Sequence, residues 1–216
     1  MFDINRLSFL SSISSLFTLL PIVFLFLNLK GASTLPIVLI IQFIVAGIVE
    51  VVGYILIKNK INNIELINIY TLVEFSLYNL FYLGYFKGHN TKVLFRLLFP
   101  VIGVTMIIDY LIYGTDRMGI ISGILESIVF VSASLYLFYE VINHNTVQNF
   151  ASSYFFWINT GILLYFSGSL LIITFDNYIL TYYPKNHSII WSTVHSFFNI
   201  TYNILLSIGI WKTRRA

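Results

Sequence analysis

Residues 34–57 read TLPIVLIIQFIVAGIVEVVGYILI, and Glu50 is the only charged residue among them. A helix that crosses the hydrocarbon core of a bilayer needs roughly 20 consecutive, mostly apolar residues. This stretch meets that requirement, so it predicts a membrane-spanning helix with one carboxyl group inside it.

Six further stretches share this length and composition. With the first, they are residues 8–29, 34–57, 65–86, 93–114, 118–141, 151–175 and 188–211. Short polar segments separate them, so successive helices should be antiparallel neighbours. No stretch is left for a soluble domain. The sequence therefore predicts an all-α fold, a seven-helix integral membrane bundle that forms a single domain over residues 1–216.

The first of these stretches also has to be weighed as a cleavable signal peptide. It follows Arg6 closely, but its apolar run is about as long as a full span, it contains Pro21, and no A-x-A cleavage site is clear. These features favour a retained helix.

The composition of the whole chain supports a membrane protein. Of its 216 residues, 58% are hydrophobic, 18% aromatic and 10% charged, whereas ordinary globular domains carry about 25% charged residues. A soluble enzyme and a disordered chain are both excluded, and the lipid bilayer is the expected partner. The absence of cysteine excludes disulfides and thiolate chemistry. The net charge of +3 does not indicate a nucleic-acid partner.

Lysine and arginine predict the orientation, because they concentrate in cytoplasmic loops. The N-terminus and the even-numbered loops hold five: Arg6, Lys58, Lys60, Arg117 and Lys185. The odd-numbered loops and the C-terminus hold seven: Lys30, Lys87, Lys92, Arg96, Lys212, Arg214 and Arg215. The larger group predicts an outside N-terminus and a cytoplasmic C-terminus.

Ionisable residues inside membrane helices are costly and mark functional sites. Five of the spans carry polar residues at spacings of three or four, which places them on one helical face. That face must point into the bundle, because lipid cannot satisfy polar groups. The candidate ligand-binding residues are Glu50, Glu74, Tyr78, Asp109, Glu126, His195 and Asn199.

The acids and His195 are expected at one depth. At about 1.5 Å per residue, they lie roughly 8–14 Å below the face that carries the second, fourth and sixth loops. The predicted orientation makes this the outer half of the bundle. A polar pocket is expected there.

The charges of this pocket indicate its ligand. Four carboxyl groups have no Lys or Arg in the middle of any span to pair with, and His195 is the one imidazole inside a span. Either most of the acids are protonated, or a cation occupies the site: a cationic small molecule, a metal or a transported proton. A competing interpretation is that each acid bonds a neighbouring helix for packing alone.

Most cofactor chemistry is set aside. Retinal needs a lysine within the last helix, and none precedes Lys212 in that span. A catalytic zinc site uses about three protein ligands, and the single intramembrane histidine supports neither that site nor paired haem ligation. An all-carboxylate metal site stays open, and no cofactor is expected.

A serine–histidine pair is the remaining catalytic alternative. Ser167 and Ser169 lie in the sixth span at about the depth of His195 in the seventh. The arrangement resembles rhomboid-type intramembrane proteases in outline, but the packing glycines that those enzymes place after their histidine are missing. An intramembrane hydrolase is therefore an alternative only.

Two segments carry a family resemblance: FWINTGILLYFSG at residues 156–168 and NITYNILLSIGIWK at residues 199–212. Both resemble stretches of small seven-helix bacterial membrane proteins, which are similar to the membrane sensor domains associated with histidine kinases. The resemblance covers essentially the whole chain. It implies signalling in a bacterial inner membrane, without naming a ligand or a catalytic residue, and no kinase module follows Trp211 in this sequence.

The leading hypothesis is a multi-pass sensory or receptor-like protein of the bacterial inner membrane. Its acid-rich pocket would bind a cationic or other small ligand and signal through a membrane or cytoplasmic partner such as a histidine kinase. The first alternative is a small transporter of a cation, a proton or a proton-coupled solute that uses the same acids. The hydrolase and a purely structural subunit of a larger complex are further alternatives.

Overall fold

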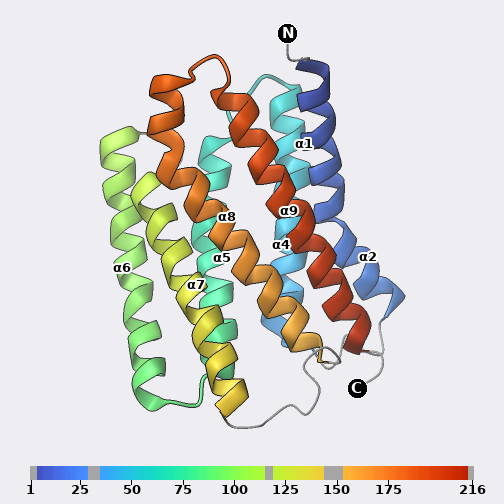
Figure 1. Ribbon diagram of the computed structural model, residues 1–216, viewed down its shortest axis with the longest axis vertical. Coiled ribbons are helices and arrows are strands. Elements are labelled where there is room, and N and C mark those ends of the chain that lie inside the picture. The colour runs from blue at the N-terminus through green and yellow to red at the C-terminus, as the bar shows by residue number, and fades with distance from the viewer. Residues whose placement is uncertain (1–3, 29–34, 115–118, 144–152, 214–216) are drawn as a thin grey trace.

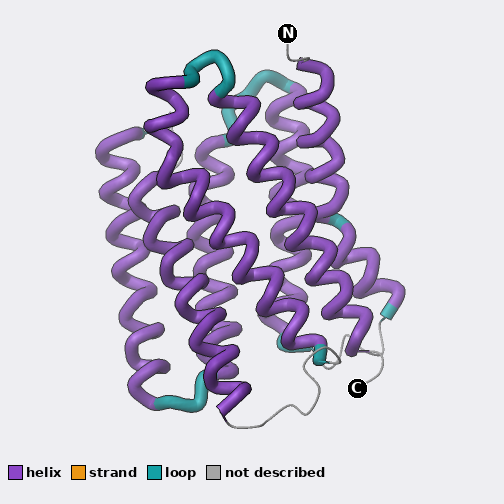
Figure 2. Tube along the Cα trace, viewed as in Figure 1, coloured by secondary structure: helices purple, strands orange, loops and turns teal. Residues whose placement is uncertain are grey.

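The computed structural model describes residues 4–28, 35–114, 119–143 and 153–213, without the side chains of residues 4–9 and 113. All regular structure in these ranges is helical (Figure 2). The helices are α1 (Ile4–Thr18), α2 (Leu20–Leu27), α4 (Ile37–Lys58), α5 (Ile64–Tyr85), α6 (His89–Tyr113), α7 (Ile120–Asn143), α8 (Tyr154–Tyr182) and α9 (His187–Lys212).

Six helical stretches in the described residues are long and apolar enough to cross a membrane. They are Leu10–Leu27, Ile37–Lys58, Ile64–Tyr85, His89–Ile112, Ile120–Asn143 and Tyr154–Tyr182. The helix α9 has 26 residues, but the polar residues that interrupt it leave it outside this set. The chain is thus a multi-pass helical membrane protein, with one fewer clearly apolar span than the seven predicted.

Two differences from the predicted spans are the largest. The first predicted span is divided at Leu19 into α1 and α2, because Pro21 has no backbone N–H and is best tolerated in the first turn of a helix. The helix α8 continues to Tyr182, beyond the predicted end at residue 175, so Asp176 is helical. Residues 29, 34, 118, 151 and 152, also within predicted spans, lie outside the described residues.

The helices lie side by side (Figure 1), and their contacts close into a ring. The order around it is α4, α5, α6, α7, α8, α9 and then α1 with α2, which contact α4 again. The helices α8 and α9 approach each other closely at a glycine of α9. A Cβ atom at Gly209 would lie 2.7 Å from Cγ1 of Ile158 and 3.0 Å from the carbonyl oxygen of Tyr154.

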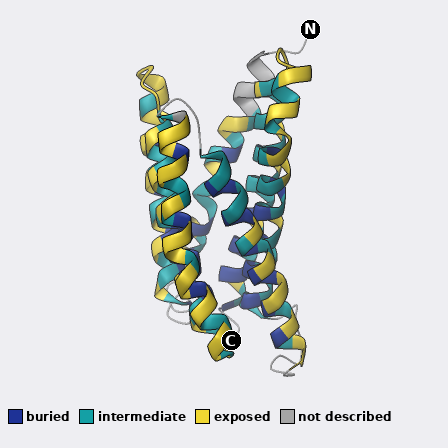
Figure 3. Ribbon diagram, turned by 90° about the vertical axis from the view of Figure 1, so that its left-hand side faces the viewer, coloured by how far each residue is buried: buried dark blue, intermediate teal, exposed yellow. Residues whose placement is uncertain are grey.

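The outer faces of the helices are exposed along much of their length (Figure 3). Many of the side chains on them are large and apolar, such as Ile48 on α4 and Leu111 on α6. A contiguous apolar surface of this kind is unfavourable in water. It is the surface that a lipid bilayer covers.

The two ends of the ring are packed differently. In the half away from the N-terminus, large aromatic side chains of α5 and α7 fill the centre, and Phe75, Phe81, Phe86 and Phe130 are almost completely buried. In the half that contains the α4–α5 and α8–α9 connections, the centre of the ring is hollow. The candidate site lies in that hollow.

Candidate functional site

A cavity of about 740 Å³ lies inside the ring, and every one of the eight described helices lines it. Its lining extends from Ile64 and His187, near the α4–α5 and α8–α9 connections, down to Tyr202 and Leu206. These connections and the N-terminus are at the same end of the molecule (Figure 1). The cavity therefore lies mainly toward that end of the bundle, although its lining extends past the middle to Gln42 and Leu206.

Five of the seven candidate binding residues line this one cavity: Glu50, Glu74, Glu126, His195 and Asn199. The side chains of Glu74 and Glu126 are only 6% and 5% exposed, and Glu50 is half-buried. The five residues come from α4, α5, α7 and α9. The structure thus brings three intramembrane acids and the intramembrane histidine to one space.

A hydrogen-bonded triad holds Glu74 in place. The Tyr70 hydroxyl donates to Oε1 of Glu74 at 3.0 Å. The Gln42 amide Nε2 donates to the same carboxylate oxygen at 3.2 Å and to the Tyr70 hydroxyl at 2.9 Å. Tyr70 is one helical turn before Glu74, and Gln42 reaches across from α4. The triad therefore fixes α4 to α5 and orients the carboxyl group.

Two buried oxygen atoms of residues that line the cavity have no hydrogen-bond partner among the described residues. They are Oε1 of Gln42 and Oε1 of Glu126. Buried polar atoms are paired in the large majority of cases, so each exception calls for an explanation. Both atoms are acceptors.

His195 belongs to an aromatic wall of the cavity. Its imidazole stacks on Trp191, with ring centroids 5.1 Å apart and planes 12° from parallel, and meets the edge of Tyr165 at 6.3 Å. Trp191 is one turn before His195, so their spacing along α9 produces the stack.

Asn199 lines the cavity but also joins α9 to α1. Its amide Nδ2 donates to Oγ of Ser14 at 2.9 Å and to Oγ1 of Thr18 at 3.1 Å. Its Oδ1 accepts from Asn203 at 3.0 Å. These contacts commit the Asn199 side chain to helix packing.

Tyr78 does not line the cavity but lies directly behind the lining residue Tyr202, at the floor of the cavity, which is its end away from the N-terminus. Its hydroxyl is hydrogen-bonded to that of Tyr202, which is a lining residue. The Tyr78 ring packs edge-on against Phe130 and Phe166, with centroids 5.6 and 5.9 Å apart. The floor is therefore a layer of packed aromatic rings.

Asp109 does not line the large cavity, and its side chain is hydrogen-bonded to the N-terminus of α7. Its carboxylate accepts from the backbone N–H of Ile121 at 3.1 Å, from that of Ser122 at 2.7 Å and from the Ser122 hydroxyl at 2.6 Å. The two backbone N–H groups are orphan donors of the first turn of α7. Asp109 lines a neighbouring cavity of about 60 Å³.

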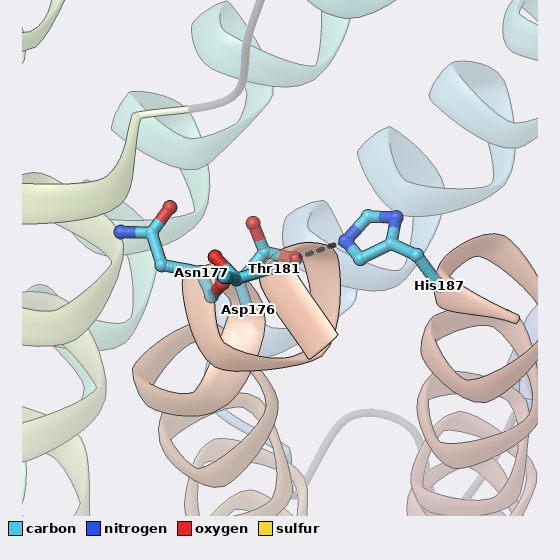
Figure 4. Close-up of polar contacts among 4 residues, drawn as sticks. All are labelled: Asp176, Asn177, Thr181 and His187. Carbon is cyan, nitrogen blue, oxygen red and sulfur yellow. Dashed lines mark hydrogen bonds and ion pairs between the residues drawn. The ribbon is translucent and has the colours of Figure 1, made fainter. Parts of the chain in front are cut away.

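The α8–α9 end of the cavity carries an ion pair that connects the two helices. Oδ1 of Asp176 lies 2.7 Å from Nε2 of His187 (Figure 4). Both residues line the cavity, and their side chains are 21% and 27% exposed. The pair therefore lies at the partly exposed end of the cavity beside the α8–α9 connection, which is the mouth of the cavity.

The two candidate nucleophiles are placed differently. The Ser167 hydroxyl donates to the carbonyl of Leu163 in its own helix at 2.7 Å, and Ser167 is not a lining residue. Ser169 lines the cavity together with His195. No hydrogen bond joins either serine to His195 in the part of the chain that the structure describes.

The chemistry of the cavity wall is one-sided. The carboxyl groups of Glu50, Glu74, Glu126 and Asp176 line it. None of its lining residues in the described ranges is Lys or Arg, and no group of three or more His, Cys, Asp or Glu residues suited to a metal ion occurs in those ranges. The wall offers acceptors and negative charge, with aromatic and aliphatic surface around them.

The sequence prediction left four of these residues out of the site: Gln42, Tyr70, Asp176 and His187. A signal existed for the first two, because Gln42 is eight residues before Glu50 and Tyr70 four before Glu74, on the same helical faces. Asp176 and His187 were assigned to a loop, and their pairing depends on the longer α8.

Comparisons of the chain with protein-family models, with curated proteins and with solved structures find no match.

Proposed function

We propose that this protein is a seven-helix sensory or receptor-like membrane protein that binds a small molecule in the cavity and signals through a partner. The observation that carries the proposal is the cavity itself. Its volume of about 740 Å³ falls in the range of small-molecule sites, about 300–1,000 Å³. Packed aromatic rings close it on the side away from the mouth, which suits a binding pocket better than a conduit.

We further propose that α9 is the seventh span and that the N-terminus lies outside a bacterial inner membrane. The basic residues near Lys212 would then be cytoplasmic, and the mouth beside His187 would open outward. A ligand arriving from outside would reach the cavity directly. The cytoplasmic end would remain available to a signalling partner such as a histidine kinase.

Signalling requires two states of the bundle that bind the ligand differently. Every helix of the ring lines the cavity, so a ligand inside it lies among residues of several helices at once. Closure around the ligand would change how the helices are spaced at the mouth. The packed half would carry this change toward the partner.

Ligand-dependent stability tests this function. The detergent-purified protein would be unfolded in the presence of a panel of amines, metals, lipids, neutral solutes and organic acids. A ligand that binds only the folded state adds about 2.7 kcal/mol at 100 times its Kd. A stabilising compound whose effect is lost in Glu74→Gln supports the receptor. No stabilisation by any compound, with acid substitutions that only lower stability, favours a structural subunit.

Transport is the second candidate, and one observation favours it. Buried polar groups continue below the aromatic floor: Tyr82 donates to Asn159 at 2.9 Å and is hydrogen-bonded to Ser134 at 2.6 Å. Such groups could serve as a route for protons to the opposite face. Flux measurements on liposomes that contain only this protein distinguish a receptor from a transporter. A receptor gives no flux of protons or bound solute, whereas a transporter gives flux that Glu74→Gln abolishes.

A further inference from the structure

We infer that the cavity takes an organic ammonium ion that carries N–H donors, that is, a protonated primary or secondary amine with an apolar group attached. This inference rests on the proposed ligand-binding function and names the chemical class of the ligand. Three features carry it: the hydrogen-bond acceptors left over at the wall, the sign of the charge, and the size and lining of the space.

The first feature is an excess of acceptors. In the triad, the amide of Gln42 uses its N–H groups on Tyr70 and Glu74, and the Tyr70 hydroxyl donates to Glu74. The donors are therefore consumed within the triad, and Oε1 of Gln42 is left unpartnered with its residue only 1% exposed. From α7, Oε1 of Glu126 is unpartnered as well. A matching ligand brings donors.

The second feature is charge. Four carboxyl groups line the cavity, and its described lining contains no Lys or Arg. A buried carboxylate without a cationic partner is strongly unfavourable. A ligand with a positive charge supplies that partner. An ammonium nitrogen that carries N–H bonds supplies both the charge and the hydrogen bonds. Asp176 is paired with His187, so the carboxyl groups that lack a cationic partner are those of Glu50, Glu74 and Glu126. Each of them that is ionised would repel an anionic ligand.

The third feature is the space around the acids. A volume of about 740 Å³ far exceeds a bare metal ion, and the described residues provide no metal-ligand cluster. Aliphatic side chains, including Ile67, Ile172 and Ile173, line the space beside the rings of Tyr165 and Trp191. An alkyl or aryl group fits this lining, and the aromatic rings also attract a cation.

The requirement for N–H donors in the ligand distinguishes protonated amines from quaternary ammonium ions. A quaternary ammonium group has the same charge but no N–H, so it would leave the acceptor oxygens of Gln42 and Glu126 unpaired. An acceptor left buried in this way costs about 1–3 kcal/mol, which is about five- to 150-fold in affinity. The structure therefore predicts discrimination between amines and their trimethylated forms.

The experiment measures the affinity of the purified full-length protein for three matched probes. They are 2-phenylethylamine, its N,N,N-trimethyl derivative and the neutral 2-phenylethanol, at neutral pH by calorimetry. The amine should bind at least about tenfold more tightly than either analogue. Equal or tighter binding of the trimethyl probe overturns the requirement for N–H donors. Equal binding of the alcohol overturns the requirement for charge.

Variants tie the result to the site. Glu126→Gln and Gln42→Met should each weaken binding of the amine by at least about tenfold. Glu140→Gln is the matched control: Glu140 lies on the same helix, is 7% exposed and accepts from the backbone N–H of Lys87 at 3.4 Å, outside the cavity. Its affinity for the amine should be unchanged. Equal weakening in the control overturns the assignment, because the losses would then reflect the fold.

Failure of this inference is distinguishable from failure of the receptor. If a neutral or anionic compound from the wider panel binds and Glu74→Gln abolishes its binding, the ammonium class is wrong and the cavity remains a receptor site. If no compound of any charge binds while all variants stay folded, both proposals are wrong.

Discussion

The two halves of the ring contain similar kinds of residue but use them differently. In the half away from the N-terminus, Tyr82, Ser134 and Asn159 satisfy one another: Tyr82 donates to Asn159, and the Asn159 amide donates to the Ser134 carbonyl at 3.0 Å. In the cavity half, Gln42 and Glu126 keep unpartnered acceptors. In the packed half, Oδ1 of Asn79 also lacks a partner, although its amide donates to the Phe95 carbonyl at 3.0 Å. The difference between the halves is therefore that Tyr82, Ser134 and Asn159 pair with one another, whereas the open acceptors of Gln42 and Glu126 belong to residues that line the cavity.

The contrast supports the proposal that one half of the ring stabilises the fold and that the other half binds a ligand. Buried polar groups that are fully paired stabilise a unique packing, whereas partly paired ones are costly unless something else completes them. Natural proteins tolerate such a cost at functional sites. Substitutions should therefore affect stability in the packed half and ligand binding in the cavity half.

The largest effect is expected from Phe130→Ala. The Phe130 ring is fully buried and contacts those of Phe75, Tyr78, Tyr82 and Phe166 at centroid distances of 4.8 to 5.9 Å. Its removal leaves a void at the floor and should lower the free energy of unfolding by about 3–5 kcal/mol. Unfolding in mixed detergent micelles measures this value. A loss below about 1 kcal/mol would mean that the floor is not a packed layer.

The next effect comes from Asn159→Ala. Asn159 is 0% exposed and holds Tyr82 and the Ser134 carbonyl together. Interhelical hydrogen bonds in membranes average about 0.6 kcal/mol, so the loss of two should lower stability by about 1–2 kcal/mol.

Ser169→Ala is the matched control for Asn159→Ala, because Ser169 lies on the same helix but faces the cavity. Its stability should remain within about 0.5 kcal/mol of the original protein. Equal losses at the two positions, measured by the same unfolding experiment, would remove the distinction between the halves.

The long apolar helices could be predicted from the sequence, because they follow from the length of the apolar runs. The common depth of the acids follows from the rise per residue and stays a prediction. Long apolar helices were predicted and are confirmed, while α9 is less clearly a span than its predicted role requires. The break at Leu19 was not predicted, since it depends on how the first turn after it accommodates Pro21.

The partners of each acid required the structure. Glu74 and Asp109 are expected at one depth, yet one lines the large cavity and the other binds the start of α7. Depth is a property of one helix, whereas hydrogen-bond partners depend on how neighbouring helices are rotated. The spacing of polar residues predicts the face of a helix but not which neighbour it meets.

Asp109→Asn tests this distinction between two acids that are expected at similar depth. The amide keeps only one acceptor oxygen and loses the charge that interacts favourably with the N-terminus of α7, so stability should fall by about 1 kcal/mol. Affinity for 2-phenylethylamine should not change, because Asp109 does not line the large cavity. A tenfold loss of affinity at unchanged stability would instead make Asp109 part of the binding site.

The smallest effect is expected at the mouth, from Asp176→Asn. The ion pair with His187 is partly exposed (Figure 4), and such pairs contribute about 0–1 kcal/mol. Stability should therefore change by less than about 1 kcal/mol, and the dissociation rate of 2-phenylethylamine should rise by less than about fivefold. Thr181→Ala is the control, because Thr181 is near the pair but donates to the Asn177 carbonyl of its own helix at 2.8 Å. Stopped-flow dissociation of the probe compares the two variants: a faster rate in Asp176→Asn alone means that the pair restrains the mouth, whereas equal rates mean that the ligand leaves without disturbing it and that retention depends on the acids deeper in the cavity.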